Sequence, residues 1–169
     1  MINLGRWWKS AKRREAAQGS PQSCEETPNC CPLCGNNMFG DISDPRREAR
    51  CPDCKRPFWF VRKTMGETVI LTFLPKLIST NEISLRGRDE LLAAAGDATG
   101  VVLNLVHLRI VSSMFLGMVV AMRATLAEAG KRLKLCGLSS EVLAVFTTAR
   151  LHTVLDISDN EQSALESFG

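Results

Sequence analysis

The pattern of apolar and polar residues alternates between strand-like and helix-like stretches after residue 66. Short apolar runs bounded by Gly, Ser or Asp are separated by longer segments in which apolar residues recur every three or four positions. This alternation predicts an α/β domain with one mixed sheet and helices packed against it. Strands are expected at 68–74, 77–79, 101–105, 133–136 and 154–157, and helices at 83–95, 114–129, 139–147 and 161–168.

The residues before this domain differ from it in charge and in cysteine content. Residues 1–66 hold 12 basic and 7 acidic side chains, whereas residues 67–169 hold 9 and 11, and six of the seven cysteines precede residue 67. With 169 residues, 45% hydrophobic and 23% charged, the chain is typical of a globular protein and too short for a large multidomain enzyme. Its longest mainly apolar run, residues 110–122, is shorter than the roughly 20 residues that span a bilayer.

Residues 1–29 are predicted to be a basic tail followed by a flexible linker. Five positive charges and two tryptophans lie within residues 6–14, a composition that suits either a solvated tail or contact with an anionic surface. Residues 15–29 are rich in Gln, Ser, Pro, Glu and Thr, as linkers are. The start of the chain does not resemble a signal peptide, so we expect a cytoplasmic protein, in which clustered cysteines hold metal more often than they form disulfides.

Two cysteine pairs in residues 30–63 predict a zinc ribbon. Each pair has the spacing Cys-x-x-Cys, and 16 residues between the pairs are enough for a hairpin that brings four thiolates together. The expected ligands of a structural zinc ion are Cys31, Cys34, Cys51 and Cys54. A rubredoxin-like iron site and two redox-active dithiols are the alternatives. Cys24 has no assigned role. Cys30 is the alternative to its neighbour Cys31 as a zinc ligand.

An aromatic run follows the second cysteine pair. Residues 58–61 are expected to form an apolar strand that covers the zinc module, and basic residues flank this strand on both sides. Basic residues interleaved with aromatic ones could also hold a nucleic-acid backbone and stack bases.

The middle of the second module resembles the STAS domain, named for sulfate transporters and anti-sigma factor antagonists. In that family a buried Leu-Asp-Leu strand leads into Asp-Ser-Ser-Gly-Leu-Gly and then into a helix that ends in Ala-Gly before Leu-Arg-Leu. The matching stretches here run from Val102 to Leu105, from Val111 to Gly117 and from Glu128 to Leu135. Residues 67–168 are covered by the resemblance, and none of residues 1–66.

The resemblance implies a phosphorylation site at the start of the long helix. In anti-sigma factor antagonists a serine or threonine there is phosphorylated by the anti-sigma factor, which is itself a kinase. Alignment on Leu116–Gly117 places the acceptor at Ser113, with Ser112 as the second choice. Ser112 replaces the usual Asp, and Phe115 replaces Gly. A phosphate would be stabilised by the helix N-terminus and would add negative charge to a docking surface. Alternatively, one of the serines is only the N-cap.

The same helix carries a row of methionines. Met114, Met118 and Met122 are spaced by four and project onto an arc apart from Leu116, Val119 and Val120. Flexible thioethers suit an adaptable docking surface, so Met114, Phe115, Met118 and Met122 are the expected partner-binding residues, although a methionine row can also be ordinary core packing.

The sequence contains no catalytic constellation. His107 and His152 are isolated, Cys136 is expected to be a buried inert thiol, and no phosphate-binding loop occurs. We therefore expect a non-enzymatic bacterial regulator of transcription that binds an anti-sigma factor or a related serine kinase. The alternative is a nucleic-acid-binding transcription regulator in which the ribbon and basic tail recognise nucleic acid and the STAS-like domain is a scaffold.

Overall fold

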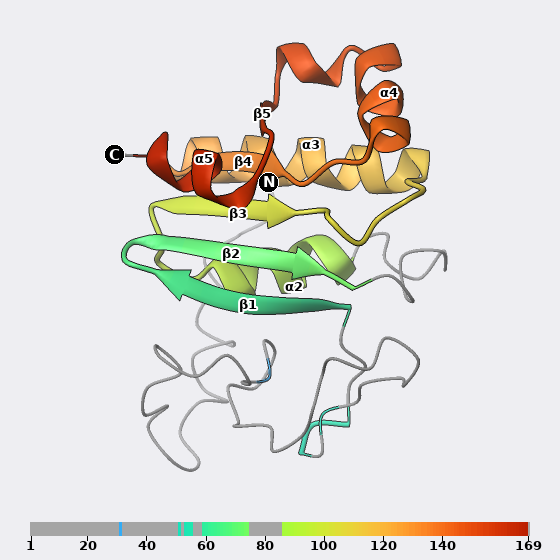
Figure 1. The fold of residues 1–169 in the computed structure, drawn as a ribbon. Coiled ribbons are helices and arrows are strands. Elements are labelled where there is room, and N and C mark those ends of the chain that lie inside the picture. Colours follow the sequence, from blue (N-terminus) through green and yellow to red (C-terminus); the bar gives the residue numbers. More distant parts are fainter. Residues whose placement is uncertain (1–30, 32–50, 52, 56–58, 75–85, 169) are drawn as a thin grey trace, which may run out of the picture.

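The computed structural model describes residues 31, 51, 53–55, 59–74 and 86–168. Within these residues a five-stranded sheet has the order β1-β2-β3-β4-β5 (Figure 1). β1 and β2 are antiparallel, and the other neighbours are parallel. The strands are β1 (Phe60–Met65), β2 (Thr68–Phe73), β3 (Gly100–Asn104), β4 (Arg132–Cys136) and β5 (Asp156–Ser158). The helices are α2 (Arg86–Ala95), α3 (Ser113–Glu128), α4 (Ser140–Thr148) and α5 (Glu161–Glu166), with a 3₁₀ turn η3 (Leu151–Thr153).

Helices cover both faces of the sheet. In Figure 1, α2 and α3 lie behind the sheet and α5 lies in front of it. The strand residues alternate accordingly, because successive side chains point to opposite faces. Leu71 and Leu103 belong to the main core with α2 and α3, whereas Ile70 and Val102 pack against Ala164 of α5. No helix in the described ranges is both long enough and apolar enough to cross a membrane.

The predicted α/β architecture is confirmed, and the strands and helices lie close to their expected positions. β2, β3 and β4 begin or end within a residue of the expected bounds, and α3 begins one residue earlier than expected. β5 begins two residues later and ends one residue later than expected, because residues 154 and 155 form a turn after η3. The expected strand at 77–79 lies outside the described residues.

The apolar strand expected at 58–61 is confirmed for Phe60 and Val61, which begin β1, and this strand belongs to the main sheet. β1 pairs with β2 along its whole length, from Phe60 opposite Phe73 to Met65 opposite Thr68, and Trp59 and Phe60 are buried in the main core. Residues 66 and 67 form the two-residue connection, in which Gly66 has a φ of 59°. Glycine at this position suits a tight hairpin. The second module therefore begins at β1 and not at residue 67.

Candidate functional site

The serine turn lies between β3 and α3. Ser112 is the N-cap of α3, with an extended backbone (φ −90°, ψ 159°). Its Oγ accepts a hydrogen bond from the backbone N–H of Phe115 at 3.2 Å, which satisfies one of the free donors at the helix start. Ser113 is the first residue of α3 and is exposed. The N-cap interpretation therefore holds for Ser112, and the hydroxyl of Ser113 is accessible to solvent.

The loop before the serine turn is anchored by two buried leucines. The backbone N–H of Leu105 donates to Cys136 O at 2.9 Å, and that of Leu108 donates to Leu105 O at 2.8 Å. Three apolar side chains of this stretch are exposed: Val106 by 50%, Ile110 by 84% and, in the first turn of α3, Met114 by 45%. Three strongly exposed apolar side chains within nine residues of chain make this segment the candidate surface for contact with a partner.

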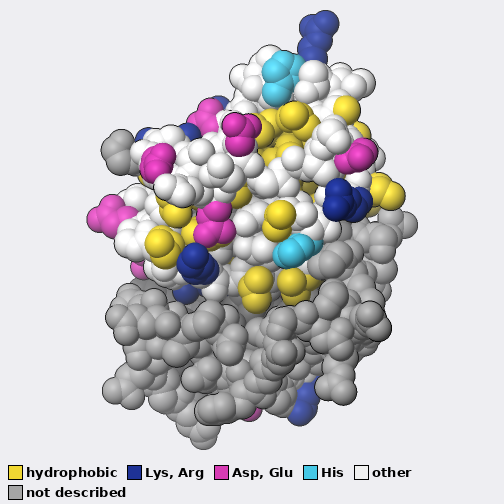
Figure 2. All heavy atoms as spheres, viewed as in Figure 1, with side chains coloured by type: hydrophobic (Ala, Val, Ile, Leu, Met, Phe, Trp, Pro, Cys, Tyr) yellow, Lys and Arg dark blue, Asp and Glu magenta, His cyan; other side chains and the backbone are white. Residues whose placement is uncertain are grey.

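The loop lies beside the start of α4. Hydrogen bonds from its own backbone N–H and from the Ser139 hydroxyl, with a smaller contribution from Arg109, lower the pKa of Glu141. A Cβ added at Gly137 would lie 3.1 Å from Val106 Cβ, so the loop runs beside the segment that leads from β4 into α4. Figure 2 shows further exposed hydrophobic side chains near the top of the view, where α4 and η3 lie; those with large exposed fractions there are Leu143, Val145 and Val154.

The expected methionine surface is wrong for most of its members. Met118 and Met122 are only 4% and 0% exposed, and Phe115 is 3% exposed, so all three belong to the core. Met114 is the exposed member. The buried face of α3 follows positions 115, 118, 119, 122 and 126, the usual spacing of a helix packed on a sheet. Because the opposite face also carries apolar residues such as Val120, projection of the sequence could not show which arc is buried.

The family motif also fits the serine turn incompletely. Aligned on Leu116–Gly117, the two serine positions of Asp-Ser-Ser-Gly-Leu-Gly fall on Ser113 and Met114. Only the first of these two positions, 113, carries a hydroxyl group in this chain. Since the Ser112 hydroxyl caps the helix, Ser113 is the better placed acceptor of the two expected.

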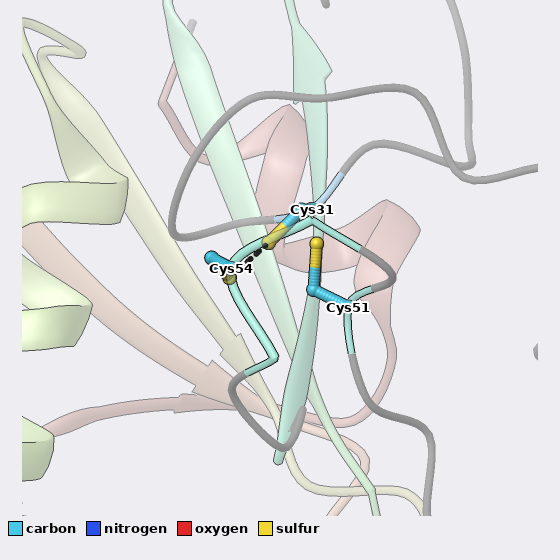
Figure 3. Close-up of side chains that lie close together, drawn as sticks. All are labelled: Cys31, Cys51 and Cys54. Carbon is cyan, nitrogen blue, oxygen red and sulfur yellow. Dashed lines mark hydrogen bonds between the residues drawn. The ribbon is translucent and has the colours of Figure 1, made fainter.

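A second candidate site is a group of thiols. The Sγ atoms of Cys31, Cys51 and Cys54 lie within 4.8 Å of one another, and Figure 3 shows the three side chains pointing toward a common centre. Cys31 and Cys51 are buried, and the Sγ atoms of Cys31 and Cys54 are 3.8 Å apart. A disulfide would require about 2.05 Å, whereas thiolates on one tetrahedral zinc ion are about 3.8 Å apart, given Zn–S bonds of about 2.3 Å.

These three thiols could therefore bind a metal ion together. After Cys54, Lys55 adopts a left-handed conformation with φ 59°, and its N–H donates to Cys51 O at 3.0 Å, which closes the turn that carries both thiols. The fourth expected ligand, Cys34, lies outside the described residues, as do Cys24 and Cys30.

Cys136, the fourth thiol in the described part of the chain, and the two histidines show no reactive arrangement with other described residues. Burial and, secondarily, the nearby Glu161 raise the pKa of Cys136 to about 11, which keeps the thiol neutral and unreactive at neutral pH. Glu161 accepts from Asn104 Nδ2 at 3.0 Å and pairs with Lys63 Nζ at 3.1 Å, so it ties α5 to β3 and β1. The residues of this network are far apart along the chain, so no local sequence pattern indicates it. His107 and His152 are exposed.

Comparisons with known proteins identify the fold. The family model of the STAS domain matches residues 60–164. A candidate anti-sigma factor antagonist from Thermotoga maritima is 20% identical with a TM-score of 0.58, and the match covers 64% of this chain and 92% of that chain. An anti-sigma-factor antagonist (STAS) domain protein from Planctomyces limnophilus is 18% identical with a TM-score of 0.56, covering 64% and 96%.

The anti-sigma factor antagonist SpoIIAA in its unphosphorylated form is 20% identical with a TM-score of 0.53, and that match covers 64% of this chain and 95% of the other. No curated protein matches. The matched region includes β1, so the resemblance seen from residue 67 onward is confirmed and extended toward the N-terminus.

Proposed function

This chain belongs to the STAS domain family, and we propose that it is a non-enzymatic regulator that binds a protein partner, an anti-sigma factor or a related serine kinase. The similar solved structures named as anti-sigma factor antagonists support this proposal. The observation that carries it is the exposure of three apolar side chains, Val106, Ile110 and Met114, in the segment that leads into the serine turn and the first turn of α3. The buried leucines hold the loop in place, so the exposure of Ile110 is not a consequence of a loose chain.

Binding to purified anti-sigma factor kinases from the same organism tests the proposal. Ile110→Ser and Met114→Ser should each weaken binding by about tenfold or more in calorimetric titrations, because they remove apolar contact area. Met65→Ser is the matched control: Met65 is 46% exposed, against 45% for Met114, and lies in the hairpin at the opposite end of the strands. Binding of none of the kinases, or equal weakening by all three substitutions, would contradict the proposal.

We further propose that Ser113 is a phosphoacceptor. Its hydroxyl is exposed at the first position of α3, where backbone N–H groups and the helix dipole favour a phosphate. Two added negative charges next to Ile110 and Met114 would oppose docking of an apolar partner. Incubation with the partner kinase and ATP, followed by mass-spectrometric mapping, should place phosphate on Ser113. Ser113→Ala should abolish the modification, while Ser112→Ala should retain it; the reverse result would assign the site to Ser112.

We also propose that Cys31, Cys34, Cys51 and Cys54 hold a structural zinc ion. The 3.8 Å separation of two sulfurs and the spacing of the cysteine pairs support tetrahedral thiolate coordination. A site of this kind needs a reducing compartment, which supports a cytoplasmic location. Elemental analysis should find one zinc per chain. Cys54→Ser should lower the zinc content, and Cys136→Ser, which changes a buried thiol of the sheet, should not. Iron in place of zinc would be apparent from its colour.

A further inference from the structure

The carboxylate of Glu161, the first residue of α5, bonds to two strands of the sheet. Its Oε1 accepts from Lys63 Nζ at 3.1 Å, and its Oε2 accepts from Asn104 Nδ2 at 3.0 Å. The helix, in front of the sheet in Figure 1, is held there by Ala164, which is fully buried in the smaller core cluster. Glu161 therefore offers Asn104, at the end of β3, an acceptor whose position is fixed by α5.

Asn104 also shapes the start of the loop that leads to the serine turn. Its Oδ1 accepts from the backbone N–H of Val106 at 3.1 Å, an arrangement in which asparagine turns the chain by bonding to the residue two positions further on. This oxygen lies in a confined space, since a Cβ added at Gly137 would lie 2.8 Å from it. The Asn104 side chain therefore sets the direction in which the chain leaves β3 and presents Val106, whose side chain is 50% exposed.

Glu161 determines which way the Asn104 amide faces. The nitrogen of the amide donates, and its oxygen only accepts. With the nitrogen toward the carboxylate, the oxygen faces the Val106 N–H, and both hydrogen bonds form. The reversed amide would place its oxygen against the carboxylate and its N–H groups against the N–H of Val106, so both bonds would be lost. The contact with α5 and the turn at Val106 therefore support each other.

We propose that Glu161 is a positioning residue for the surface that binds the partner, because it holds, through Asn104, the turn that presents Val106. This inference rests on the proposed function, since Val106 is one of the three exposed apolar side chains that lead into the serine turn. It adds to that function a dependence of partner affinity on α5, a helix from the C-terminal end of the chain.

Hydrogen exchange of the Val106 amide, followed by NMR on the full chain without a partner, tests the link from α5 to the turn. In Glu161→Ala the Asn104 amide loses its fixed acceptor, so the Val106 N–H should exchange at least about threefold faster than in the wild type. The amides of residues 101–103, in the centre of β3, should change less, which separates a local change from a loss of overall stability. Lys63→Gln is the matched control: it removes the ion pair of Glu161 and leaves the bond to Asn104, so exchange at Val106 should stay as in the wild type.

An exchange of side-chain types between positions 104 and 161 tests the link from the turn to the partner. Asn104→Asp keeps an acceptor for the Val106 N–H but places a second carboxylate against Glu161. In calorimetric titrations with the anti-sigma factor kinase it should weaken binding by about fivefold or more. The double variant Asn104→Asp/Glu161→Gln has one carboxylate and one amide again, at the net charge of the wild type, with the donor now at position 161. Its affinity should lie within about twofold of the wild type.

Unchanged exchange of the Val106 amide in Glu161→Ala would overturn the inference. A double variant that binds the kinase no better than Asn104→Asp would also overturn it, since the effect of Glu161 would then not pass through Asn104. Failure of every kinase to bind the wild type would overturn the proposed function. The exchange rates, which need no partner, would still decide whether Glu161 holds the turn.

Discussion

The burial of two of the three methionines on α3 gives a direct test of how this helix is oriented. Met122 is fully buried and Met118 is 4% exposed, whereas Met114 is 45% exposed. Met→Ala removes three heavy atoms, worth about 2.4 kcal/mol if each counts as a buried methylene at about 0.8 kcal/mol. The cavity left behind adds to this, so Met122→Ala should lower the free energy of unfolding by about 2–5 kcal/mol. Met114→Ala, at the exposed position, should change the free energy of unfolding by less than about 0.5 kcal/mol.

Chemical denaturation followed by circular dichroism measures these differences under identical conditions. Met122→Ala should also lower the melting temperature by at least about 8 °C, since 1 kcal/mol corresponds to roughly 4–8 °C in a domain of about 100 residues. The loss in free energy of unfolding of Met118→Ala should lie near the lower end of the range given for Met122→Ala. Met114→Ala should be as stable as the wild type. If Met114→Ala and Met122→Ala cost the same, the assigned orientation of α3 is wrong.

The other predictions concern single positions whose surroundings are equally well defined. Ser112→Ala should lower the free energy of unfolding by about 1 kcal/mol because a helix N–H loses its acceptor, while Ser113→Ala should cost less than about 0.5 kcal/mol; chemical denaturation compares the two. Gly117→Ala should stabilise α3 by about 0.5–1 kcal/mol, because a Cβ there would meet no atom within 4 Å. Gly100→Ala should instead destabilise the domain, since its Cβ would lie 2.8 Å from the Thr68 hydroxyl and 2.9 Å from a ring carbon of Phe168. A melting temperature of Gly100→Ala at or above that of the wild type would refute this. The folded-state pKa of Cys136 is about 11 against a usual 9.0, so the stability from its neutral thiol is complete below pH 9.0 and is lost as the pH rises through 11. Between these pH values the free energy of unfolding of the wild type should fall by up to about 3 kcal/mol more than that of Cys136→Ala. Equal pH dependence of the two unfolding free energies would contradict the burial of the thiol.

Much of the candidate site could be read from local sequence because it depends on local chemistry. Ser112 caps α3 through an N–H three residues further on, so the cap is contained within one turn of chain. The spacing within each cysteine pair likewise suggested a shared ligand before any contact was known. The turn at Gly66 could have been found in the same way, because glycine before a strand-like run is a recognised hairpin signal.

The sequence by itself determined the α/β alternation and the start of α3, both of which follow from neighbouring residues. Only the tertiary structure decided that Met118 and Met122 face the sheet, because α3 is apolar on more than one side and its buried face is chosen by what packs against it. The same holds for β1, which joins the sheet through its pairing with β2. Side chains far apart in the chain, such as Trp59 and Phe73, become neighbours only when the sheet forms, since their contact depends on strand register and not on sequence distance.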